Sequence, residues 1–227
     1  YSIMKGLVIQ VCYDCSGGGA EFIANKISSI KNPEKFESKA IFFKNNKKIP
    51  IKNNQIVLNS HKKFSLITFI KLFFLIFKLS NNYSKVILHA HLTEALYFLT
   101  PFSYFKKFNL IYTEHNSKYS KRKYFFVRPL EKFVYSRYLK IISISHFVQK
   151  ELLAWLEIDP DKKNIYKKKF LVIFNGAKQY DFIERDLNKE KFNLISIGSL
   201  TQQKSHDVSI RAVSNCKEMI NSYLIFG

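Results

Sequence analysis

Short apolar runs alternate with longer segments of helical periodicity along most of the sequence, and this alternation restricts the fold more than any other feature. Seven apolar runs are predicted to be strands, at residues 6–12, 40–43, 55–58, 85–90, 110–113, 140–144 and 170–174. Helical patterns lie at about 20–30, 64–79, 92–104, 127–138 and 146–156. Strands that alternate with helices in this way are typical of an α/β domain with a mostly parallel sheet.

The same pattern begins again after a polar segment. Residues 192–198 are predicted to form a strand, 204–219 a helix and 223–226 a second strand. A single strand–helix–strand unit is too small to bury a core of its own. We therefore predict one whole domain at 4–178, a linker at 179–191 and the incomplete start of a second α/β domain at 192–227.

The charge indicates an anionic partner. The chain has 227 residues and a formal net charge of +20, and its 47% hydrophobic content excludes a disordered protein. Nucleic acid, a membrane surface or a phosphorylated ligand would each fit such a charge. Only five of the 37 basic residues are Arg, the residue that most often reads bases and phosphates, so we expect no nucleic-acid partner.

Residues 64–79 are apolar apart from Lys71 and Lys78, which share one helix face. The segment is short for a membrane span, which needs about 20 apolar residues. A basic amphipathic helix can lie on an anionic membrane surface, but the same pattern also fits an ordinary helix that covers a sheet. The basic run at 118–123 is a second candidate for such a contact, or a solvated loop.

The three cysteines are too few for a disulfide framework, and no N-terminal stretch has the pattern of a signal peptide. We therefore expect a cytoplasmic protein, with peripheral attachment to the inner face of the membrane as a further expectation. Cys12 and Cys15 form a C-x-x-C pair. A buried, structural Cys12 on the strand explains this pair more simply than redox chemistry does. The Asp-Pro-Asp at 159–161 is typical of a turn rather than of a metal site.

The glycines at 17–19 lie between the first strand and the first helix. Backbone N–H groups at such a junction can approach a phosphate, although a plain tight turn explains the glycines equally well. Phe22 stands where a dinucleotide-binding motif needs its third glycine, so that motif is not supported.

Several polar residues follow predicted strands. His91, His115, Ser145 and Asn175 join the glycine turn at the carboxyl ends of strands, where open parallel sheets bind ligands. We therefore predict that they line one crevice. His89, His91, Glu94 and His115 are potential metal ligands, but their spacing matches no metal motif and we expect no metal. His89 is also explained as a buried, hydrogen-bonded residue.

In this order, the motifs resemble glycosyltransferase family 4, whose members have the GT-B architecture of two Rossmann-like domains. The resemblance rests on residues 16–21, 89–91, 112–116, 142–145, 151–152, 172–176, 197–200, 204 and 210–212. It implies transfer of a sugar, with retention, from a nucleotide-diphosphate-sugar donor to a glycan or lipid-linked acceptor. Cell-surface polysaccharide biosynthesis is the implied setting.

The resemblance also implies roles for individual residues. His115 would be catalytic, hydrogen-bonding the transferred sugar, and Gly18, Gly19, Ser199 and Lys204 would contact the donor phosphates. The remaining matches, acceptor-side or structural, are His91, Glu94, Ser145, Asn175 and Gly176. Asn-Gly is a turn signal, and the pair at 175–176 matches the turn that leads into the interdomain linker of the family. No cofactor or metal is implied, because fixed cations and helix N-termini can stabilise the charge on the departing diphosphate.

Two positions differ from the family pattern. Ser199 stands where the family usually has Arg, and Lys178 stands where it usually has Asp. The family's paired Glu residues and base pocket would lie beyond Gly227, so we expect the 227 residues alone to be inactive. The alternative is a catalytically inactive remnant of such a transferase that binds a membrane or a polysaccharide.

Overall fold

The computed structural model describes residues 6–15, 18–30, 32, 34–60, 62, 64–116, 119, 122, 124–159, 168–177, 181 and 191–227. These residues belong to two compact units, divided between Gly176 and Ala177. Most of the predicted linker at 179–191 lies outside the described residues, as does Lys178. Each unit is described by itself.

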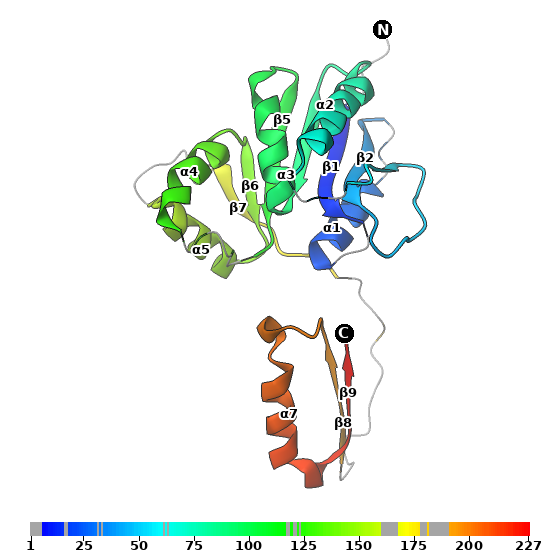
Figure 1. Ribbon diagram of the computed structural model, residues 1–227, viewed down its shortest axis with the longest axis vertical. Helices are drawn as coiled ribbons and strands as arrows, with labels where there is room; N and C mark the ends of the chain where they lie inside the picture. Colours follow the sequence, from blue (N-terminus) through cyan, green and yellow to red (C-terminus); the bar gives the residue numbers. More distant parts are fainter. Residues whose placement is uncertain are drawn as a thin grey trace. The chain divides into compact units, whose positions relative to one another are not determined.

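The first unit is built on a seven-stranded parallel sheet, with the order β3-β2-β1-β4-β5-β6-β7 (Figure 1). Its strands are β1 (Gly6–Asp14), β2 (Phe36–Lys44), β3 (Gln55–Val57), β4 (Val86–His91), β5 (Phe108–Glu114), β6 (Lys140–Ser143) and β7 (Phe170–Val172). All seven predicted strands are present and lie in this one sheet. Strand β1 pairs with both β2 and β4, so the chain reverses its direction across the sheet after β3.

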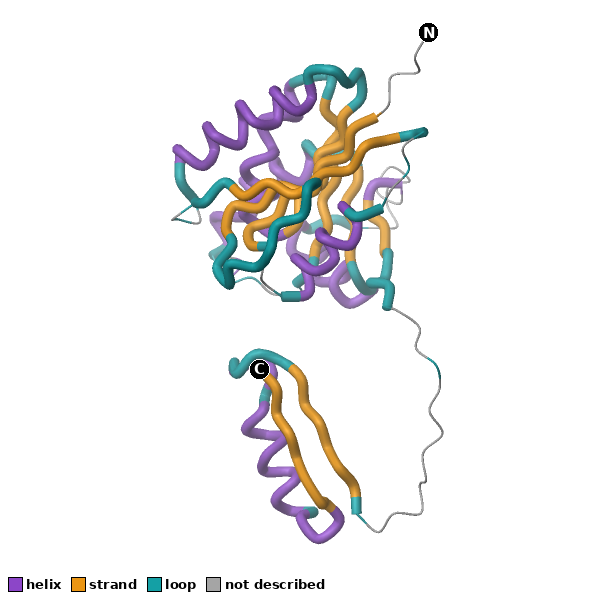
Figure 2. The backbone as a smooth tube through the Cα atoms, turned by 90° about the vertical axis from the view of Figure 1, so that its right-hand side faces the viewer, coloured by secondary structure: helices purple, strands orange, loops and turns teal. Residues whose placement is uncertain are grey.

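Helices connect the strands and lie on both sides of the sheet, as Figure 2 shows. They are α1 (Gly19–Ser28), α2 (Leu66–Ser80), α3 (Leu92–Leu99), α4 (Arg128–Ser136) and α5 (His146–Leu156), with 3₁₀ turns η1 (Thr100–Tyr104) and η3 (Phe125–Val127). The predicted helix at 92–104 changes to a 3₁₀ turn at Thr100, since Pro101 lacks the N–H that an α-helix needs.

Two groups of buried side chains show why the sheet needs helices on both faces. Leu7, Ile9 and Val11 of β1 belong to the larger core cluster, whereas Cys12 belongs to a smaller one with Ala24 of α1. Successive side chains of a strand point to opposite faces, so the two clusters fill the two faces of the sheet. The near-continuous apolar run of β1 is therefore explained by burial on both sides.

Helix α2 begins at an N-cap, where the Ser65 hydroxyl accepts a hydrogen bond from the N–H of Thr68. Its buried face repeats every four residues, at Thr68, Leu72, Ile76 and Ser80. Lys71 and Lys78 are both exposed on the opposite side. Among the described residues, no helix has the length and hydrophobicity required to cross a membrane.

The second unit contains β8 (Phe192–Ile197), the 3₁₀ turn η4 (Gln202–Lys204), α7 (His206–Asn215), the 3₁₀ turn η5 (Lys217–Met219) and β9 (Ile220–Phe226). The two strands are parallel and connected through α7. The predicted helix at 204–219 is therefore shorter and is flanked by 3₁₀ turns. This strand–helix–strand unit after a complete parallel sheet confirms the predicted fold class, an α/β protein of GT-B type with the start of a second Rossmann-like domain.

Candidate active site at the carboxyl ends of the sheet

The neighbouring strands β1, β4 and β5 bring Gln10, His91 and His115 together, the first from the middle of β1 and the other two from the carboxyl ends of β4 and β5. The ring of His91 lies between the other two side chains: its Nδ1 is 3.0 Å from His115 Nε2, and its Nε2 is 2.8 Å from Gln10 Oε1. Gln10 and His91 are buried, and His115 is partly exposed. Two of the predicted site residues, His91 and His115, are thus in direct contact, although they are 24 positions apart in the chain.

His89 lies on the same side of β4 as His91, and the centroids of the two rings are 4.2 Å apart. Its Nε2 is 2.7 Å from the hydroxyl oxygen of Thr113 on β5. Of the two interpretations considered for His89, this geometry fits the buried, hydrogen-bonded residue.

Burial keeps these three imidazoles neutral. It lowers the pKa of His115 to about 4 and that of His89 to about 3, with the neighbouring His115 adding to the second effect. The pKa of His91 lies well below its ordinary value, because the ring is buried beside two other histidines. At neutral pH each ring therefore carries one N–H donor and one acceptor nitrogen.

We expect the stability of the first unit to fall as the pH drops from about 6.5 towards 4. In this range the unfolded chain binds protons on His89, His91 and His115, whereas the folded chain keeps them neutral. The free energy of unfolding should therefore fall by up to about 1.4 kcal/mol per pH unit for each such histidine. Urea unfolding followed by the fluorescence of the single Trp, Trp155 in α5, measures this at pH 7 and pH 5. Equal stability at the two values would contradict the buried neutral state.

The glycine turn precedes α1, with Gly18 as its N-cap and Gly19 as its first residue. A Cβ atom at Gly19 would meet nothing within 4 Å, and one at Gly18 would meet only a carboxylate oxygen of Glu21 at 3.8 Å. Packing against the described residues therefore does not explain these glycines. Residues 16 and 17 lie outside the described part of the chain.

Carboxylates surround this turn. Burial raises the pKa of Glu21, and the nearby carboxylates of Asp14 and Glu94 raise it further. Glu94 itself is buried in the first turn of α3. Carboxyl groups near Gly18 and Gly19 can accept hydrogen bonds, and the hydroxyl groups of a ligand can donate them.

The other predicted residues of the first unit lie at the same edge of the sheet. The Ser145 hydroxyl accepts a hydrogen bond from the N–H of Val148, 3.2 Å away, and so caps α5. Asn175 and Gly176 follow β7 in an exposed segment. The predicted Asn-Gly turn is wrong, because residues 173–177 form no turn and Gly176 does not adopt a positive φ.

Lys204 and Ser199 belong to the second unit. The aliphatic part of Lys204 lies against Gly198, where an added Cβ would come within 3.3 Å of it. Glycine at 198 thus lets the lysine cross the end of β8. Ser199 is exposed beside it, and His206 Nε2 lies 3.1 Å from the Gly198 carbonyl oxygen at the start of α7. The unit therefore places a lysine and a helix N-terminus at the carboxyl end of its first strand.

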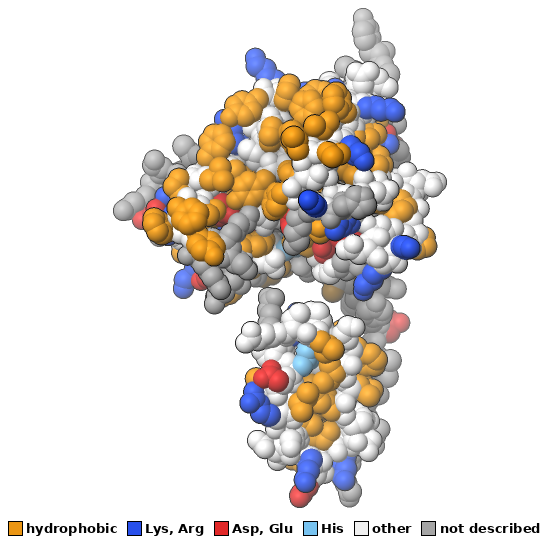
Figure 3. Space-filling model, viewed as in Figure 1, with side chains coloured by type: hydrophobic (Ala, Val, Ile, Leu, Met, Phe, Trp, Pro, Cys, Tyr) orange, Lys and Arg blue, Asp and Glu red, His pale blue; other side chains and the backbone are white. Residues whose placement is uncertain are grey.

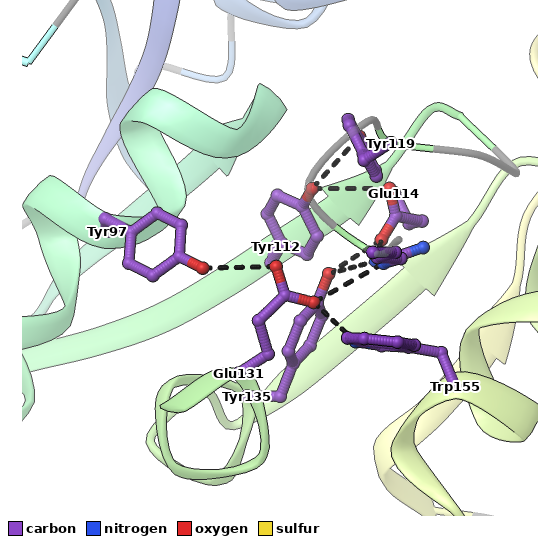
Figure 4. A network of polar contacts seen from close by, with 8 residues as sticks. Tyr97, Tyr112, Glu114, Tyr119, Glu131, Tyr135 and Trp155 are labelled. Carbon is purple, nitrogen blue, oxygen red and sulfur yellow. Dashed lines mark hydrogen bonds and ion pairs between the residues drawn. The ribbon is translucent and has the colours of Figure 1, made fainter. Parts of the chain in front are cut away.

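A buried network behind His115 has no counterpart in the sequence predictions (Figure 4). Arg122 lies between two glutamates: its Nη2 is 2.8 Å from a carboxylate oxygen of Glu114, and its Nε is 3.4 Å from one of Glu131. Neither interpretation of the run at 118–123, a lipid contact or a solvated loop, fits Arg122, whose side chain is only 8% exposed. Residues 118, 120, 121 and 123 lie outside the described residues.

Aromatic side chains add further hydrogen bonds to this network, although Arg122 Nη1 is buried without a hydrogen-bond partner among the described residues. Tyr135 donates to Glu114 at 2.7 Å, and Trp155 donates to Glu131 at 2.7 Å. Burial and the carboxylate of Glu114 raise the pKa of Tyr135, so that its hydroxyl remains a donor. The network joins β5, α4 and α5, and it fixes the residue that immediately precedes His115. The sequence signal that could have indicated this network is Arg122, which stands alone among the lysines of the run at 118–123.

In the part of the chain that the structure describes, the remaining motifs form no reactive site. Cys12 and Cys15 are buried free thiols, and burial raises the pKa of both, which disfavours the reactive thiolate. Within the described residues, no group of three or more His, Cys, Asp or Glu side chains is placed to hold a metal ion. Of the Asp-Pro-Asp motif, only Asp159 is described.

The sheet order and the second, partial α/β unit define a Rossmann-like protein of GT-B type, and comparison with solved structures agrees. The chain is similar to Anabaena HepE, solved in complex with UDP and glucose, with a TM-score of 0.63 and 15% identity over 96% of this chain. It is also similar to a glycosyltransferase from Rickettsia africae, with a TM-score of 0.55 and 18% identity over 97% of this chain. A third neighbour is a putative UDP-N-acetylglucosamine 2-epimerase from Listeria monocytogenes, with a TM-score of 0.52 and 15% identity over 97% of this chain.

At these identities the similarity establishes the fold alone. The chain spans 60% of the length of HepE and of the Rickettsia protein, and 63% of that of the Listeria protein. No protein-family model matches the sequence, and no curated protein sequence matches it.

Proposed function

We propose that this chain belongs to a retaining glycosyltransferase of the family 4 type. In this proposal, the first unit binds the acceptor and the second begins the domain that binds a nucleotide-diphosphate-sugar donor. The observation that carries the proposal is the neutral, partly exposed His115, held by His91 at the carboxyl end of the central strands. A neutral imidazole can exchange hydrogen bonds with sugar hydroxyls without adding a charge to the site.

The charged residues of the two units support different roles in binding the substrates. Asp14, Glu21 and Glu94 make the surroundings of Gly18 and Gly19 suited to hydroxyl groups, which an acceptor or a sugar supplies. Lys204 and the N-terminus of α7 offer the positive charge that a departing diphosphate requires. We therefore assign binding of the diphosphate to the second unit, through Lys204, and binding of the sugar hydroxyls to the first unit, through His115, with no metal in the scheme.

The proposal is tested on the product of the complete gene that encodes this chain. The purified protein is incubated with a panel of UDP-, GDP- and ADP-sugars and with glycan and lipid-linked acceptors, and the released nucleoside diphosphate and the product are measured. We expect transfer from at least one donor, with the anomeric configuration of the donor retained in the product as seen by NMR. Inversion, or 2-epimerisation of the sugar without transfer, would refute the proposal.

An anionic membrane surface is the second proposed partner, because the exposed face of α2 is both apolar and basic. This face consists of Ile67, Ile70, Lys71, Phe74 and Lys78, and Ile67 and Phe74 are 67% and 69% exposed. Figure 3 shows a broad area of hydrophobic side chains on the first unit, with basic side chains beside it. Apolar side chains that enter the headgroup region and lysines that meet anionic lipids are the two contributions such binding needs.

The double charge reversal Lys71→Glu/Lys78→Glu should abolish this binding. Each lysine near an anionic surface contributes about 1 kcal/mol, so the partition coefficient of the protein onto phosphatidylserine vesicles, measured by sedimentation, should fall more than tenfold. The matched control, Lys35→Glu/Lys52→Glu, changes two other exposed lysines by the same charge and should sediment like the unchanged protein. If the two double variants behave alike, binding follows from net charge and not from α2.

A further inference from the structure

Gln10 is a buried polar residue in the middle of an apolar strand. Its neighbours Ile9 and Val11 are completely buried, and Gln10 itself is 1% exposed. Its Oε1 meets His91, but its Nε2 is buried and has no hydrogen-bond partner among the described residues. A buried amide that is only half satisfied costs stability, and an apolar residue of the same length would avoid this cost. The contact with His91 is therefore the feature that explains Gln10.

In the two hydrogen bonds that connect Gln10, His91 and His115, the chemistry of Gln10 determines which atom is the donor and which is the acceptor. The oxygen of Gln10 can only accept, so the proton of neutral His91 lies on Nε2. The Nδ1 of His91 is then an acceptor, and the Nε2 of His115 has to donate to it. Neutral His115 consequently has a bare Nδ1, an atom with no hydrogen-bond partner among the described residues.

The backbone next to His91 is strained in a way that fits this arrangement. Leu92 adopts a φ of +66°, a left-handed conformation that residues other than glycine seldom adopt. Leu92 follows His91, the last residue of β4, and is the first residue of α3. Strained residues of this kind persist where the surrounding structure enforces them, often beside functional groups.

We propose that Gln10 and His91 are positioning residues that hold His115 in one tautomer, protonated on Nε2. The bare Nδ1 of His115 then accepts a hydrogen bond from a hydroxyl group of the bound sugar. The assignment of a sugar to this atom rests on the proposed glycosyltransferase function, whereas the tautomer does not. Gln10 acts only through His91, and it fixes the direction of the whole chain of hydrogen bonds.

The tautomer is measured directly by long-range ¹H–¹⁵N NMR of the histidine rings in the 227-residue chain, without donor or acceptor. In the unchanged protein we expect His115 to show a protonated Nε2 and a bare Nδ1. Gln10→Met and His91→Phe should each give a mixture of both tautomers at His115. His91→Asn retains a carbonyl oxygen near the position of Nδ1, so this variant should restore the single tautomer.

Gln149→Met on α5 is the matched control and should leave the spectrum of His115 unchanged. The proposal is overturned if unchanged His115 is protonated on Nδ1, or if His91→Phe retains the original tautomer. Should His91→Phe fail to fold, as judged by Trp155 fluorescence, the unchanged protein and Gln10→Met still decide the matter. The glycosyltransferase proposal is judged separately by the transfer assay, so a correct tautomer without any transfer would refute that proposal alone.

Discussion

Arg122→Met is expected to destabilise the first unit by roughly 3–5 kcal/mol, the usual cost of removing one partner from a buried ion pair. The carboxylates of Glu114 and Glu131 are almost completely buried, and Arg122 is the cation that contacts both. Without it, two negative charges would remain in the core, and the other described residues that hydrogen-bond to them are neutral. Urea unfolding followed by circular dichroism gives the change in free energy of unfolding.

Two further variants separate charge from packing. Arg137→Met removes a guanidinium that contacts the Ser103 hydroxyl at 2.9 Å and lies over the ring of Tyr104, and it should cost about 1 kcal/mol or less. Adding Glu114→Gln to Arg122→Met removes one of the orphaned charges and should recover part of the lost stability. If the charge-neutralised variant is no more stable than Arg122→Met alone, unpaired charge is not the cause.

His115→Ala is expected to lower the rate of sugar transfer by about 10²- to 10³-fold in the active gene product. The reason is that the proposal makes His115 Nδ1 the acceptor for a sugar hydroxyl that is aligned during transfer. The side chain is partly exposed, so its removal should change the free energy of unfolding far less than kcat. Initial rates at saturating donor and acceptor measure the effect.

Asn109→Ala provides the control for this measurement. Asn109 is an exposed residue near the other end of the same strand, and its replacement should leave kcat close to that of the unchanged protein. His115→Ala with an unchanged kcat would remove His115 from the mechanism. A fall in kcat accompanied by an equal loss in the Asn109 variant would instead indicate general damage to β5.

The sequence by itself predicted the type of fold, and it placed the candidate site residues at one edge of the sheet. Apolar runs separated by helical patterns are a local signal, because burial on both faces of a parallel sheet imposes it on each strand separately. His91 and His115 were identified as site residues because each follows such a run. The Asn-Gly pair at 175–176 predicted a turn that the structure does not have. The preference of a dipeptide for a turn is also a local signal, but it is weak compared with the packing around it.

Only the tertiary structure decided which of these residues meet. The order β1-β4-β5 places Gln10 beside His91, and His91 beside His115, although Gln10 and His91 are 81 positions apart. The burial of Arg122 within a basic run likewise depends on carboxylates that come from β5 and α4. Periodicity records how each segment faces the core, but strand order and ion pairing depend on contacts between distant segments. For this reason the sequence indicated the two histidines, and the fold alone revealed that Gln10 contacts His91 and that Arg122 contacts Glu114, the residue before His115.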